Sequence, residues 1–97
     1  MPRNPSKPFL VVEDEENDVF FLQRTIRKAN VENPIQVVNT GDEAIEYLAG
    51  RGKYQDREKF PLPSLVFLDL HLAGRLGLEV LTWLRKQPHL DAIIVIL

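Results

Sequence analysis

The chain has no cysteine among its 97 residues, which excludes disulfide bonds and metal sites built from thiolates. No apolar run approaches the roughly 20 residues that a membrane span needs. Its charge is nearly balanced, with 12 basic and 14 acidic residues, so electrostatics gives no reason to expect nucleic acid or a membrane as a partner. We expect a cytoplasmic protein with one folded domain over residues 9–97. Residues 1–8 lack the apolar core of a signal peptide, and we expect them to form a disordered N-terminal arm.

Four apolar runs predict the strands of a sheet. Phe9–Val12, Leu65–Leu68 and Ile93–Leu97 are continuously apolar, which is typical of buried strands covered on both faces. The run Ile35–Val38 is weaker and predicts a more exposed edge strand. Because the chain stops directly after an apolar run, we expect the domain to be incomplete at its C-terminus.

Apolar residues at spacings of three and four predict a helix between each pair of strands. The predicted helices cover residues 18–29, residues 41 to 50 or 52, and residues 77–87. Asn17 is the expected N-cap of the first helix, and Phe20 and Phe21 are expected to pack against the core. The segment 51–63 is expected to be a polar surface loop in which Arg57-Glu58-Lys59 is solvated.

The alternation of strands and helices predicts an α/β fold with a parallel sheet and right-handed crossovers. If the most apolar strands are central, the strand order is 2-1-3-4. That order is the one found in the flavodoxin-like doubly wound fold, which places ligands at a switch point between strands one and three.

Three acids are expected to meet at this switch point. Glu13 and Asp14 follow the first strand, and Asp69 follows the central strand. Crowded carboxylates in a crevice cost a few kcal/mol, unless they bind a proton or a cation. Because Mg²⁺ prefers oxygen ligands, we predict a magnesium site in which Asp69 is either a ligand or a nucleophile. The neighbouring acids Glu15, Glu16 and Asp18 are assigned instead to the positive end of the first helix dipole.

Two stretches of the sequence resemble response regulator receiver domains of two-component signalling. Leu10–Asp14 resembles their first strand and acidic pair, and Leu65–Leu72 followed by Gly77–Leu81 resembles their phosphoacceptor strand, loop and third helix. The likeness covers residues 9–97. The long segment between Gly50 and Pro63 is similar to stand-alone receivers that partner phytochromes.

The resemblance implies a phosphoacceptor signalling domain that is not a multiple-turnover enzyme. Asp69 would accept a phosphoryl group from a sensor histidine kinase or phosphotransfer protein, and a second copy of the chain, forming a homodimer, is a further candidate partner. Mg²⁺ would be held by the side chains of Asp14 and Asp69, by Glu13 through a water, and by the backbone carbonyl of His71.

The chain also departs from the family pattern. Ala73 stands where the family commonly has Pro, Leu76 where it often has Asp, and His71 where it often has Asn. The His71 side chain would tune dephosphorylation, compete as a metal ligand or face solvent. The family's switch residues, a Ser or Thr and a Lys, would lie beyond Leu97, together with the fifth strand and the last helices.

Two other functions are compatible with these residues. The departures at Ala73, Leu76 and His71 favour a pseudo-receiver, an interaction module that is not phosphorylated. A metal-dependent phosphohydrolase would use Asp69 as nucleophile, but His71 stands where such enzymes usually carry a second acid. A nucleotide- or flavin-binding domain is disfavoured, because acids replace the Gly-rich loop expected after the first strand.

Overall fold

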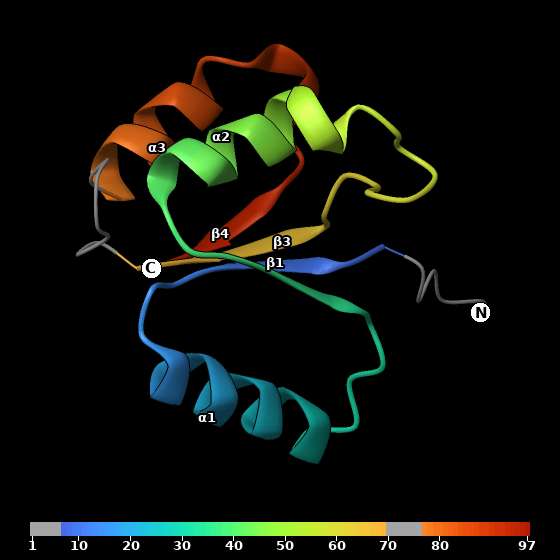
Figure 1. Cartoon of the computed structure of the whole chain (residues 1–97), viewed down its shortest axis with the longest axis vertical. Coiled ribbons are helices and arrows are strands. Elements are labelled where there is room, and N and C mark those ends of the chain that lie inside the picture. The colour runs from blue at the N-terminus through green and yellow to red at the C-terminus, as the bar shows by residue number, and fades with distance from the viewer. Residues whose placement is uncertain (1–6, 70–76) are drawn as a thin grey trace.

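The computed structural model describes residues 7–69 and 77–97. In these ranges the chain forms a parallel four-stranded sheet with the order β2-β1-β3-β4 (Figure 1). The strands are β1 (Phe9–Val12), β2 (Ile35–Val38), β3 (Leu65–Leu68) and β4 (Ile94–Ile96). The predicted order 2-1-3-4 and the flavodoxin-like fold class are therefore confirmed.

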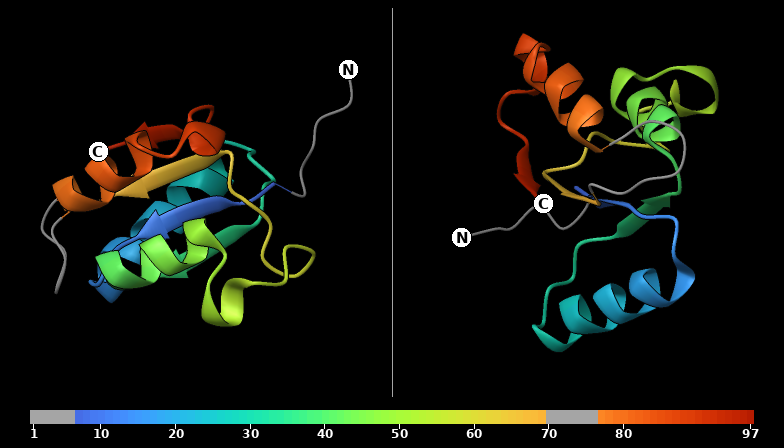
Figure 2. Two further views of the ribbon diagram at one scale, coloured as in Figure 1. Left: turned by 90° about the horizontal axis from the view of Figure 1, so that it is seen from above. Right: turned by 90° about the vertical axis from the view of Figure 1, so that its left-hand side faces the viewer.

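Helices cover both faces of the sheet. Helix α1 (Glu16–Lys28) lies on one face, and α2 (Gly41–Ala49) and α3 (Gly77–Arg85) lie side by side on the other (Figures 1 and 2). Two short 3₁₀ helices, η1 (Gly52–Tyr54) and η2 (Pro88–Leu90), follow α2 and α3. Within the described residues, every helix is too short or too polar to serve as a membrane span.

The main core lies between the sheet and the helices α2 and α3. Because side chains alternate across a strand, Leu10 and Val12 of β1 point into this layer together with Val66 and Leu68 of β3. They pack with buried side chains of the two helices, which are Ala44, Ile45, Tyr47, Leu48, Val80 and Leu84. Each large apolar side chain buried here contributes roughly 1.5–3 kcal/mol.

Helix α1 differs from the prediction at two points. Its N-cap is Glu15 rather than Asn17: the Glu15 carboxylate accepts a hydrogen bond from the Asn17 N–H at 3.0 Å. The expected core packing of Phe20 and Phe21 is wrong, because these side chains are 60% and 72% exposed. Ile26 is the buried side chain of α1, and at 3.6 residues per turn the helix phase that buries it turns both phenylalanines toward solvent.

Helix α2 ends as expected at Gly50, whose φ of +71° is the left-handed conformation typical of a helix C-terminus. The segment after it, residues 51–63, lies largely at the surface as predicted, but part of it packs onto the helix. Tyr54 is buried and packs against the rings of Tyr47 and Phe60, whose centroids lie 4.8 and 5.0 Å from its own. This part of segment 51–63 is therefore packed onto α2.

Arg57 was expected to be solvated, and this expectation is wrong. Its guanidinium donates hydrogen bonds to the carbonyls of Tyr47 (2.8 Å), Leu48 (2.9 Å) and Phe60 (3.2 Å). The Tyr47 carbonyl also accepts the Gly50 N–H at 3.2 Å. The Leu48 carbonyl lies in the last turn, whose carbonyls have no partner within the helix, so the guanidinium satisfies a group that otherwise needs water.

Residues 1–6 of the expected arm lie outside the described residues, but Lys7 and Pro8 are bound to the domain. Pro8 is buried, and its carbonyl accepts the Ser64 N–H at 3.1 Å. The Lys7 carbonyl accepts the Asn33 side-chain amide at 2.8 Å. These two bonds attach Lys7 and Pro8 to the folded domain.

Candidate metal centre

The three predicted acids come from the carboxyl ends of the two central strands. Glu13 and Asp14 follow β1, and Asp69 follows β3. Val12 is paired with Leu68, so the next residues, Glu13 and Asp69, are neighbours across the two strands. Backbone hydrogen bonds hold both: the Asp69 N–H donates to Val12 at 3.2 Å and the Glu13 N–H donates to Val38 at 3.0 Å.

The side chains of the three acids converge as the topology predicts. One carboxylate oxygen from each of Glu13, Asp14 and Asp69 lies within 4.8 Å of the other two. Opposite ligands of an octahedral Mg²⁺ are about 4.2 Å apart, so small side-chain movements would suffice to bring all three oxygens to one ion. His71, Ala73 and Leu76 lie outside the described residues.

The carboxyl group of Glu13 is the electrostatically strained member of the cluster. Burial raises its pKa above the ordinary value, and the charge of Asp69, a hydrogen bond with Asp69 and the charge of Asp18 raise it further. The Glu15 N–H, which donates to Glu13 at 3.1 Å, acts in the opposite direction. Without a cation close by, the Glu13 carboxyl therefore holds a proton more tightly than an isolated glutamate does.

Two of the three acids border a shallow cavity of about 190 Å³ at the end of the sheet. Glu13 and Asp69 form its polar part, and its apolar wall consists of Val12, Phe67, Leu68, Ile96 and Leu97. A larger cavity, of about 550 Å³, lies between α1 and Ile35, but its lining residues include no carboxylate. Oxygen ligands for a hard cation are therefore found at the smaller cavity.

The structure adds one residue that the sequence analysis missed. Asn39, which follows β2, donates its side-chain amide to the Glu13 carbonyl at 3.1 Å. Its position at the carboxyl end of a strand beside β1 was the signal in the sequence that could have identified it. The bond to the Glu13 carbonyl itself depends on how the ends of β1 and β2 are placed relative to each other.

Comparison with known proteins identifies relatives along nearly the whole chain, although no family model matches it. Response regulator Rcp1 of Synechocystis sp. is 32% identical over 93 residues, which cover 96% of this chain and 61% of Rcp1. The chain thus spans about three fifths of the length of this relative.

Solved structures give the same result. The bacteriophytochrome response regulator AtBRR is 35% identical with a TM-score of 0.86, covering 98% of this chain and 66% of AtBRR. The phosphorylated cyanobacterial phytochrome response regulator RcpA is 32% identical with a TM-score of 0.83, covering 93% of this chain and 62% of RcpA. The Mn²⁺-bound form of Rcp1 is 31% identical with a TM-score of 0.82, covering 92% of this chain and 62% of Rcp1.

Fold, sequence and site therefore agree: the chain is a response regulator receiver domain of two-component signalling. The relatives named above are Rcp1 and two phytochrome response regulators, so the chain is similar to the phytochrome-associated members of that class.

Proposed function

We propose that this chain is a cytoplasmic phosphoacceptor domain in which Asp69 receives a phosphoryl group from a sensor histidine kinase or phosphotransfer protein. The observation that carries the proposal is the approach of three carboxylate oxygens, from the ends of β1 and β3, to within 4.8 Å of one another. Two relatives with the same fold support it: RcpA has been solved in a phosphorylated form and Rcp1 in a Mn²⁺-bound form.

Mg²⁺ is the cation we propose for the cluster. Asp14 and Asp69 would bind it directly and Glu13 through a water, while the backbone carbonyl of His71, outside the described residues, would supply a further ligand. A bound Mg²⁺ supplies positive charge that offsets the charge of the phosphoryl oxygens.

The chemistry of the acceptor requires one displacement at phosphorus. A carboxylate oxygen of Asp69 forms the new P–O bond, the P–N bond to the donor imidazole breaks, and the imidazole nitrogen keeps the electron pair and takes up a proton. The product is an acyl phosphate on Asp69. Attack by water then releases inorganic phosphate and restores the carboxylate. Each cycle therefore returns the chain to its unphosphorylated state.

The proposal is tested by phosphorylating the chain with acetyl phosphate and Mg²⁺ and measuring its intact mass. We expect the mass of one phosphoryl group to be added to the parent chain and to Asp91→Asn, an exposed acid outside the cluster. Asp69→Asn should show none, because its side chain has no nucleophilic carboxylate.

Three outcomes would contradict the proposal. Unchanged labelling of Asp69→Asn would place the phosphoryl group elsewhere. A parent chain that is never labelled would favour the pseudo-receiver, an interaction module without phosphorylation. Fast release of phosphate over many turnovers, in place of the slow hydrolysis expected of a receiver's acyl phosphate, would favour the phosphohydrolase.

A further inference from the structure

Two asparagines fasten the two ends of the β1–β2 pair in the same way. At one end, the Asn33 amide donates to the Lys7 carbonyl at 2.8 Å. At the other end, the Asn39 amide donates to the Glu13 carbonyl at 3.1 Å. Each bond joins residues 26 apart in sequence, but only the bond of Asn39 reaches the acidic cluster.

The Asn39 bond completes the fixation of the Glu13 main chain. The Glu13 N–H already donates to Val38, and its carbonyl now accepts from Asn39. That carbonyl belongs to the peptide bond between Glu13 and Asp14, which is planar. Holding its oxygen therefore restricts the position of the Asp14 backbone as well.

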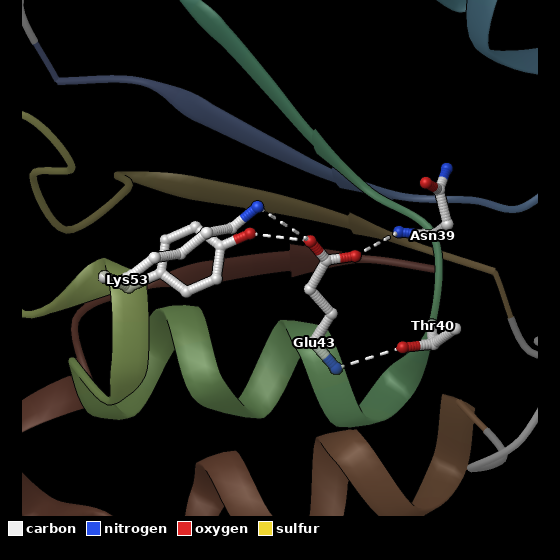
Figure 3. A network of polar contacts seen from close by, with 5 residues as sticks. Asn39, Thr40, Glu43 and Lys53 are labelled. Carbon is white, nitrogen blue, oxygen red and sulfur yellow. Dashed lines mark hydrogen bonds and ion pairs between the residues drawn. The ribbon is translucent and has the colours of Figure 1, made fainter.

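Asn39 is itself held from the side of α2. Its backbone N–H donates to one carboxylate oxygen of Glu43 at 3.2 Å, as Figure 3 shows. The other oxygen of Glu43 accepts the Tyr54 hydroxyl at 2.6 Å and lies 3.8 Å from Lys53 Nζ. The Glu43 N–H donates to Thr40 Oγ1, the N-cap of α2, at 3.1 Å. The asparagine is thus attached to a helix N-terminus and to the packed segment 51–63.

We propose that Asn39 is a positioning residue for the acidic cluster: it sets the Glu13–Asp14 peptide so that both side chains face Asp69. This inference rests on the proposed metal-dependent function. Groups that orient metal ligands typically change metal affinity 10- to 100-fold when they are removed. Asn39 contacts the ligands' backbone rather than their carboxylates, so we expect about the tenfold end of that range.

The test is a Mg²⁺ titration of the full chain by isothermal calorimetry, with thermal unfolding of each metal-free variant measured alongside. Asn39→Ala should weaken Mg²⁺ binding about tenfold. Asn33→Ala is the matched control, because it removes the same kind of amide-to-carbonyl bond from the far end of the strand pair. It should leave Mg²⁺ affinity unchanged even if it lowers the unfolding temperature.

Two further variants keep the test decisive. Asn39→Leu keeps the branched shape of the side chain without its donor and should behave like Asn39→Ala. Asn39→Gln keeps an amide donor and should recover part of the affinity.

The outcomes separate this inference from the function it rests on. If Asn39→Ala and Asn39→Leu bind Mg²⁺ as the parent does while Asp14→Asn does not bind, the positioning role is refuted and the metal site stands. Equal weakening in Asn33→Ala would also refute it, because the effect would then be a general loss of stability. A parent chain that binds no Mg²⁺, or an Asp14→Asn variant that binds it normally, would overturn both.

Discussion

At Glu13 the fold places a carboxyl group where its charge is unfavourable. Its backbone continues β1, and its carboxyl group is thereby held beside Asp69 at the end of β3. Burial and the neighbouring acid raise its pKa, so the folded state binds a proton at Glu13 more tightly than the unfolded chain does.

The sign of the resulting pH dependence follows from linkage. A carboxyl group whose pKa is raised on folding adds stability that is fully present below its ordinary pKa of 4.5. This stability is lost as the pH rises through the higher pKa of the folded state. At neutral pH without a cation, ionised Glu13 therefore opposes folding.

We expect Glu13→Gln to raise the unfolding temperature of the metal-free chain at pH 7 and to leave it nearly unchanged below pH 4.5. Glutamine cannot ionise, and its amide can donate to Asp69. Because Glu13 is partly in water, the gain should stay below the roughly 4–8 °C that 1 kcal/mol gives in a domain of this size. Differential scanning calorimetry at the two pH values measures it.

Glu58→Gln, an exposed acid in segment 51–63, serves as the control and should change the unfolding temperature little at either pH. A Glu13→Gln chain that is less stable than the parent at pH 7 would show that the Glu13 carboxylate supports the fold rather than opposing it.

Helix α2 and the segment after it act as one unit. The rings of Tyr47, Tyr54 and Phe60 pack against one another in tilted and edge-to-face pairs, and the Tyr47 hydroxyl donates to the Pro61 carbonyl at 2.8 Å. Arg57 donates hydrogen bonds to the last carbonyls of the helix. The same helix begins at Thr40 beside Asn39, so segment 51–63 supports an element that reaches the edge of the acidic cluster.

Arg57→Ala should lower the free energy of unfolding by about 2 kcal/mol, the typical value of hydrogen bonds to a charged group. Arg57→Lys should recover little, because a single ammonium cannot match the fork of a guanidinium. Urea unfolding followed by circular dichroism measures both variants.

Lys59→Ala tests whether removing any positively charged side chain from this segment lowers the free energy of unfolding as much as Arg57→Ala does. Lys59 is exposed, and its ammonium lies 5.6 Å from the centre of the Phe60 ring, a contact worth about 0.5–1 kcal/mol in water. Equal losses in Arg57→Ala and Lys59→Ala would argue against a specific capping role for Arg57.

At the scale of the whole molecule, the acidic cluster couples a bound ligand to global stability. Its carboxylates come from two strands that are far apart in sequence and meet only in the folded sheet. A cation that binds all three acids therefore binds the folded state and not the unfolded chain, which raises the free energy of unfolding by mass action.

We expect Mg²⁺ at about 100 times its dissociation constant to stabilise the chain by about 2.7 kcal/mol. In a domain of this size that corresponds to a rise of about 10–20 °C in unfolding temperature. Scanning calorimetry with Mg²⁺, and again after chelation, measures the shift. Asp14→Asn should abolish it, and an equal shift in that variant would place the cation elsewhere.

The sequence by itself determined the order of the elements, the strand order of the sheet and the meeting of Glu13, Asp14 and Asp69. Apolar runs and helical spacing are local patterns. Once they indicate a parallel sheet, the carboxyl ends of its central strands must share one edge. The acids that follow Val12 and Leu68 were therefore brought together by topology alone.

Only the tertiary structure decided which side chains meet across distant segments. The exposure of Phe20 and Phe21 depends on the rotational phase in which α1 docks. The bonds from Arg57 to Leu48, from Tyr54 to Glu43 and from Asn39 to Glu13 join residues 9 to 26 apart. They depend on how the ends of the loops are placed relative to the helices and strands. Such contacts leave no periodic trace in the sequence, because each is set by the geometry of two elements rather than by the pattern of either one.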